Sequence, residues 1–130
     1  MDLITAIARW TLGLFFVAAG TFHFIHPETY QLIMPSYLPY PAALIAISGA
    51  AEIAGGIGIL IPQVRRLAGY GLIALLIAVF PANINMAMHD IQLPGIHLTP
   101  IMQWSRLPLQ LVFMAWVWWV ALRKPADGDR

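Results

Sequence analysis

The chain has 130 residues, 60% of them hydrophobic and only 10% charged, with a formal net charge of +1. A chain this short and apolar leaves no room for a soluble domain beside membrane segments, so we expect a single transmembrane domain over residues 1–130. The small net charge argues against nucleic acid as a partner, and the lack of cysteine excludes disulfides, iron–sulfur clusters and thiol nucleophiles.

Four apolar runs account for almost the whole chain. Each is near the ~20 residues that a helix needs to cross a bilayer. We expect spanning helices at about residues 3–25, 41–61, 67–88 and 101–122. Thr99 and Pro100 supply an N-cap and a first-turn proline for the last one. A cleaved signal peptide is the alternative for the first run, but that run lacks a basic leading segment and contains Arg9.

The connection between the first two runs, residues 26–40, is too long for a plain turn. We expect a short interfacial helix that starts at Pro27 and lies flat on the outer surface, with Tyr30, Ile33 and Met34 against the other helices. The predicted fold is therefore all-α: an integral membrane four-helix bundle, antiparallel, with this short helix between helices 1 and 2.

Lysine and arginine predict the orientation. They occur between the second and third runs and after the fourth, whereas the other two connections contain neither. The residues concerned are Arg65, Arg66, Arg123, Lys124 and Arg130. The positive-inside rule then places both termini in the cytoplasm.

Glu52 lies inside an otherwise uncharged run, where a carboxylate costs roughly 2.5–3.5 kcal/mol and so requires a partner or a function. At ~1.5 Å per residue, Glu52 lies roughly 14 Å and Arg9 roughly 9 Å from the inner side, whereas Arg106 enters from the outer side. We therefore predict a structural ion pair between Arg9 and Glu52, with Arg106–Glu52 as the alternative.

Helical spacing sorts the remaining polar residues onto helix faces. The first run carries one stripe of Arg9, Gly13, Phe16, Gly20 and His23, and the second a stripe of Ser48, Glu52, Gly55 and Ile59. The abundant glycine and alanine of the second run predict close packing against neighbouring helices.

The third and fourth runs add amides and a second arginine. Pro81 cannot donate to the carbonyl of Ile77, which is left free for another donor, and Arg106 and Gln110 lie one turn apart. We expect a polar ligand pocket in the outer half of the bundle. Its predicted lining is His23, Glu52, Asn85, Arg106 and Gln110, with Asn83 replacing Asn85 if Pro81 does not bend the third helix inward.

Imidazole and thioether groups also gather toward the outer side. His23, His26, His89 and His97 are ligand types that suit copper, zinc or haem, but their spacing matches no established metal motif. We therefore predict no metal site.

Several segments resemble the DoxX-like family of small four-helix bacterial membrane proteins. They are Arg9, LGLFFVAAGTFHFIHP (residues 12–27), MPSYLPYP (34–41), SGAAEIAGGIGILIP (48–62), VFPANINMAMH (79–89) and RLPLQ (106–110). The resemblance covers nearly the whole chain in order. It implies a protein of the bacterial inner membrane with a quinone or sulfur-redox connection.

Three classes of function remain at this point. The first is a protein that binds a quinone, or another small carbonyl-bearing or anionic ligand, in the intramembrane pocket, with an arginine or amide on the ligand oxygen and a carboxylate or histidine for its proton. The second is a non-catalytic anchor or partner subunit of an oxidoreductase. The third is a permease for a small polar solute, which with four helices requires a homo-oligomer.

Overall fold

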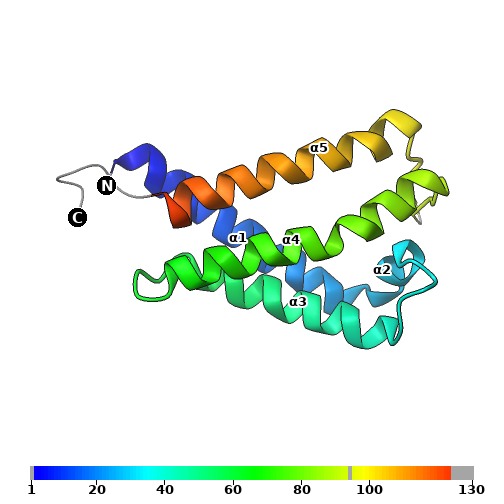
Figure 1. Ribbon diagram of the computed structural model, residues 1–130, viewed down its shortest axis with the longest axis horizontal. Helices are drawn as coiled ribbons and strands as arrows, with labels where there is room; N and C mark the ends of the chain where they lie inside the picture. Colours follow the sequence, from blue (N-terminus) through cyan, green and yellow to red (C-terminus); the bar gives the residue numbers. More distant parts are fainter. Residues whose placement is uncertain (1, 94, 124–130) are drawn as a thin grey trace.

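The computed structural model describes residues 2–93 and 95–123, and this part of the chain is all-helical, with four long apolar helices and one short one (Figure 1). The elements in chain order are α1 (Leu3–Ile25), α2 (Pro27–Ile33), α3 (Pro41–Gly58), α4 (Arg65–Met88), α5 (Pro100–Val117) and a π-helical turn, η1 (Trp118–Leu122). With α5 and η1 taken together as one span, the predicted spans agree with these bounds to within three residues. Lys124 and Arg130, which enter the predicted orientation, lie outside the described residues.

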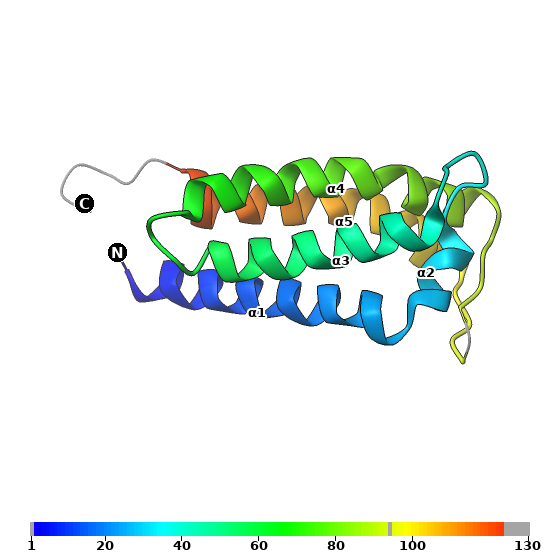
Figure 2. The same cartoon turned by 90° about the horizontal axis from the view of Figure 1, so that it is seen from below.

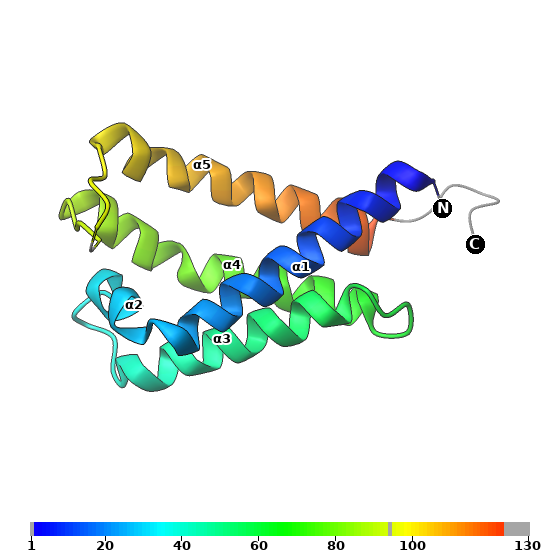
Figure 3. The ribbon, with the colours of Figure 1, turned by 180° about the vertical axis from the view of Figure 1, so that it is seen from behind.

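The four long helices lie side by side along the long axis of the molecule, and α2 lies across one end (Figure 2). The N-terminus and the α3–α4 connection are at the opposite end from α2 (Figure 2). Seen from behind, α1 runs obliquely across α3 and α4 (Figure 3). The short helix predicted from Pro27 is therefore present, and α2 contacts α1, α3 and α4.

Local sequence signals explain where the helices begin. The Asp2 side chain accepts a hydrogen bond from the Thr5 backbone N–H at 2.7 Å and caps α1. The predicted cap of α5 is confirmed, because Thr99 Oγ1 accepts from the Met102 N–H at 3.3 Å. Proline occupies the first turn of α2, α3 and α5, where its missing N–H costs nothing.

The buried core lies where α1 meets the ends of α3 and α5. It includes Leu12, Phe16, Ile59, Leu72 and Val117. The predicted stripe on α1 is confirmed: Arg9, Gly13, Phe16, Gly20 and His23 are all buried.

Two glycine pairs bring α1 and α3 into backbone contact. A Cβ added to Gly20 would lie 2.5 Å from the Gly49 carbonyl oxygen, and one added to Gly56 would lie 2.6 Å from that of Gly13. Real Cβ contacts are never this short, so no larger residue fits without separating the helices. The predicted close packing of this small-residue helix is confirmed; it packs on α1 and, through Gly55 and Gly58, on α4.

Candidate functional site

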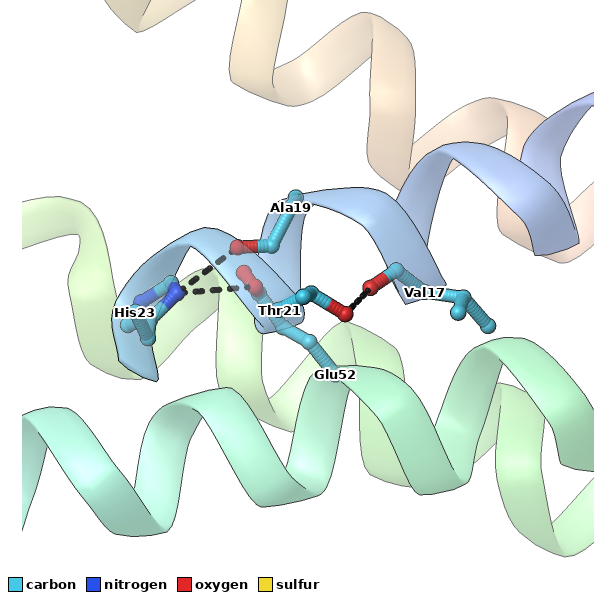
Figure 4. A network of polar contacts seen from close by, with 5 residues as sticks. All are labelled: Val17, Ala19, Thr21, His23 and Glu52. Atoms are coloured by element: carbon cyan, nitrogen blue, oxygen red, sulfur yellow. Dashed lines mark hydrogen bonds and ion pairs between the residues drawn. The ribbon is translucent and has the colours of Figure 1, made fainter. Parts of the chain in front are cut away.

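His23 on α1 and Glu52 on α3 point toward one another across the helix contact (Figure 4). His23 Nδ1 lies 3.0 Å from the Ala19 carbonyl oxygen and 3.3 Å from Glu52 Oε2. Both side chains are largely buried, with 9% and 13% of their surfaces exposed. Within the described residues, Glu52 Oε2 is buried without a hydrogen-bond partner, and the imidazole of His23 is the ionisable group in contact with it.

The glycine contacts explain why these two groups meet. A Cβ on Gly49 would lie 2.7 Å from the Cβ of His23, and one on Gly20 would lie 3.0 Å from the Cβ of Glu52. The small residues thus let the backbones approach until the imidazole and the carboxylate come within polar contact.

Tyr30 of α2 covers one face of the histidine ring. Its ring stacks on the His23 ring with centroids 3.9 Å apart and an interplanar angle of 17°. Burial raises the pKa of the Tyr30 hydroxyl above its usual value; the Glu52 charge adds to this rise, and the Arg106 charge opposes it. Tyr30 is therefore a neutral hydroxyl donor at ordinary pH.

His23 and Tyr30 border a partly open cavity of about 210 Å³, which is lined by α1, α2, α3 and α4 and by the α2–α3 connection. Ser48 supplies a third polar group at its wall. The rest of the lining is apolar: Ile33, Met34, Leu38, Leu44, Ile45, Ala78, Val79 and Ala82.

A separate chain of hydrogen bonds joins α4 and α5. Asn83 Nδ2 donates to Gln110 Oε1 at 2.7 Å, and Arg106 donates to Asn83 Oδ1 at 3.4 Å. Gln110 Nε2 in turn donates to the carbonyl of Leu76, one residue before the acceptor that we expected Pro81 to free. The buried Gln110 amide thus satisfies the backbone of α4 near its proline.

Asn85 lies elsewhere. Its Nδ2 donates to the Ile33 carbonyl at 3.0 Å and ties the end of α2 to α4. Of the two asparagines, it is therefore Asn83 that joins Gln110 and Arg106. This is the arrangement predicted for the case in which Pro81 does not bend the third helix inward.

The six residues predicted for one pocket thus separate into three groups. His23 lines the cavity with Glu52 against it, whereas Asn83, Arg106 and Gln110 form the α4–α5 chain, and Asn85 holds α2. Arg106 is exposed and does not line the cavity.

The predicted Arg9–Glu52 ion pair is not formed, and the alternative Arg106–Glu52 pair is not formed either. Arg9 Nε donates to the Val120 carbonyl at 2.9 Å, and Glu52 faces His23. The physical reason is the register of the helix contact. Glu52 packs against Gly20, which lies eleven residues, or roughly 16 Å of helix, beyond Arg9.

The sequence does not predict the contact between Tyr30 and His23. The predicted position of Tyr30 against the long helices is correct, but α2 is too short for helical spacing to show that the ring would stack on His23. In residues 2–93 and 95–123, no three His, Cys, Asp or Glu side chains come together as a metal site would require.

Residues 12–121 match the family described as Domain of unknown function (DUF8561), and the chain belongs to this family. Searches of curated proteins and of solved structures find no match to it.

Proposed function

We propose that this DUF8561 protein is an integral membrane protein that binds a small neutral ligand bearing a carbonyl or hydroxyl group, such as a quinone headgroup, in the His23–Tyr30 cavity. The observation that carries the proposal is the buried His23–Glu52 contact at the wall of a largely apolar cavity. Such a cavity, with a few convergent polar groups, is the usual form of a small-molecule site.

The membrane assignment is supported by helix length and by the outer surface. Four helices are long and apolar enough to cross a bilayer. Their outward faces are apolar too: Ile4, Leu14, Ile47, Leu67, Ile77 and Leu111 each expose more than half of their surface. In water such a large apolar surface would promote aggregation, whereas the lipid-facing surface of a membrane protein is expected to be apolar.

We further propose an antiparallel four-helix bundle with α2 at the outer membrane surface and both termini in the cytoplasm. The two glycine pairs support opposite directions for α1 and α3, because Gly13 meets Gly56 and Gly20 meets Gly49. Arg65, Arg66 and Arg123 gather at the end away from α2, which the positive-inside rule makes the cytoplasmic end. The resemblance to DoxX-like proteins favours the bacterial inner membrane.

The size of the cavity suits one substituted ring. An engineered cavity of ~150 Å³ holds benzene, and drug-sized ligands need about 300 Å³ or more. At about 210 Å³ the cavity lies between these values. A ring headgroup would fit, with any long tail extending into lipid between the helices.

The polar groups favour a neutral ligand over an anion. His23 is the one basic side chain among the described residues that line the cavity, and the Glu52 carboxylate lies against it. The Tyr30 hydroxyl is a donor suited to a carbonyl oxygen. His23, with the Glu52 carboxyl against its ring, is the group placed to exchange a proton with a ligand hydroxyl.

Binding of a short-chain benzoquinone by the purified protein in neutral detergent tests the proposal. Ala82→Leu adds three carbon atoms to the cavity wall, and Ala74→Leu makes the same change on the exposed surface of α4. We expect Ala82→Leu to weaken binding at least about tenfold, which corresponds to ~1.4 kcal/mol, and Ala74→Leu to leave it unchanged. Equal affinities for the two variants would show that the quinone partitions elsewhere. A tight complex with a soluble oxidoreductase and no quinone binding would favour the partner-subunit function instead.

A further inference from the structure

An open groove of about 290 Å³ follows α3 and α4 between the cavity and the α3–α4 connection. Its lining consists of glycine, alanine, valine and leucine alone, and its walls include Ala51 of α3 and Gly71 of α4. Because the lining has no polar side chain, the groove offers a ligand little beyond van der Waals contact. A hydrocarbon chain is the kind of occupant that suits such a surface.

Side chains of the described residues do not fill this groove. A Cβ added to Gly71 would meet no atom of the described chain within 4 Å, and Ala51 is exposed. Helix packing explains the glycine at the floor, since a Cβ on Gly55 would lie 2.5 Å from Leu72 Cδ2. It does not explain the small residues of the walls, which face outward.

The groove continues the cavity along the same faces of two helices that lie side by side (Figures 1 and 3). On α4, steps of four and three residues lead from Gly71 in the groove through the half-buried Leu75 to Ala78 at the cavity. On α3, Ala51 in the groove lies one turn from Ser48 at the cavity wall. The two spaces therefore lie end to end along the α3–α4 pair.

The cavity itself has room for a ring and not for a long chain attached to it. Its volume is about 210 Å³, and His23 and Ile45 are buried in its lining. Ala78, by contrast, is exposed, so the cavity opens toward the apolar outer surface at this residue. A chain that leaves the cavity beside Ala78 reaches the groove directly.

We infer that the ligand of the cavity carries a long hydrocarbon chain, such as the isoprenoid tail of a membrane quinone, and that the groove between α3 and α4 holds the part of this chain next to the ring. The inference rests on the proposed function, because it assigns the ring to the His23–Tyr30 cavity. In a bilayer the chain exchanges contacts with lipid for contacts with protein, so its contribution comes from close packing. The ligand class is then a membrane-soluble one that enters sideways from the bilayer.

Binding of two benzoquinones to the purified full chain in neutral detergent tests the inference: one without a side chain and one with a decyl chain. Ala51→Leu adds three carbon atoms to the groove wall. Ala50→Leu is the matched control, since this neighbouring alanine is also exposed on α3 but lines neither space. Gly71→Leu repeats the test from the α4 wall. Each variant is compared with the unchanged protein at one detergent concentration, so the partition of each quinone into micelles cancels.

We expect Ala51→Leu and Gly71→Leu to weaken binding of the decyl quinone at least about fivefold and to change that of the tail-free quinone less than about twofold. Ala50→Leu should change neither affinity. Equal losses at positions 50 and 51, or equal losses for the two quinones, overturn the inference. Groove variants that dissociate an oligomer in light scattering, without a loss specific to the decyl quinone, assign the groove to a second copy of the chain and overturn it as well.

The tail-free quinone separates this inference from the proposed function. If Ala82→Leu weakens its binding while the groove variants leave the decyl quinone unaffected, the tail groove is wrong and the ring site stands. If neither quinone binds, both proposals are wrong.

Discussion

Alanine in place of Gly20 tests how closely α1 and α3 must approach. The new Cβ would lie 2.5 Å from the Gly49 carbonyl oxygen, 2.8 Å from Ile53 Cγ1 and 3.0 Å from Glu52 Cβ. A backbone carbonyl cannot rotate away, so the helices must separate. Overpacking of this kind costs about 1–3 kcal/mol, and alanine in a helix interior regains roughly 0.5–1 kcal/mol. We expect the free energy of unfolding to fall by the difference, up to about 2.5 kcal/mol.

Unfolding in mixed micelles with increasing denaturing detergent, followed by circular dichroism, measures this change. Gly71→Ala is the matched control, since a Cβ on Gly71 of α4 has no atom within 4 Å. It should leave stability unchanged or raise it by up to about 1 kcal/mol. Because the contact at Gly20 also sets the distance between His23 and Glu52, Gly20→Ala should weaken quinone binding, whereas Gly71→Ala should not. A Gly20→Ala protein as stable as Gly71→Ala would refute the view that backbone contact holds α1 against α3.

Four further predictions concern the polar groups. Gln110→Leu removes the bonds to the Leu76 carbonyl and to the Asn83 amide, so the free energy of unfolding should fall by about 1–3 kcal/mol in the same micelle assay. Glu52→Gln removes a buried charge whose Oε2 has no hydrogen bond, so it should lower quinone affinity in calorimetry without lowering the unfolding midpoint. Tyr30 releases its proton less readily in the folded protein than in the unfolded chain, so stability should fall as pH rises above about 10; a pH series should show a shallower fall for Tyr30→Phe. Arg106→Gln should change quinone affinity less than twofold (under about 0.4 kcal/mol), because Arg106 does not line the cavity. A tenfold loss of affinity would show that this arginine contacts the ligand.

The helices and the buried stripe of α1 could be predicted from the sequence because both depend on local patterns. Apolar runs of spanning length mark the four long helices, and prolines and Thr99 mark their starts. Steps of three and four residues place Gly13, Gly20 and His23 on one face whatever that face contacts.

The charge partners could not be predicted in the same way. The sequence predicts ion pairs only from the depth of each charged residue in the membrane. Depth does not include the register between α1 and α3, which the glycine contacts determine. That register carries Glu52 to Gly20, out of reach of Arg9. The carbonyl that Arg9 contacts lies in the π-helical turn after α5, and no apolar pattern distinguishes such a turn from a regular helix.

The cavity could be anticipated only in part, because it depends on a short connecting helix. α2 has too few residues to show an apolar face, and its position follows from the hydrogen bond between Asn85 and the Ile33 carbonyl. The sequence instead predicts Asn85 at the ligand. The stacking of Tyr30 on His23 depends on where the bond between Asn85 and the Ile33 carbonyl holds α2, and the sequence alone does not predict that bond.

The hydrogen bonds between the two ends of the chain bear on the order of events during synthesis. Trp116 Nε1 donates to the Ala8 carbonyl at 3.2 Å, and Arg9 Nε donates to the Val120 carbonyl, across 108 and 111 residues. Since synthesis proceeds from the N-terminus, α1 and α3 can close on their glycines long before these donors and acceptors meet. The bonds at Ala8 and Val120 therefore belong to the last stage of assembly, when α5 and η1 have left the ribosome and reach the start of α1.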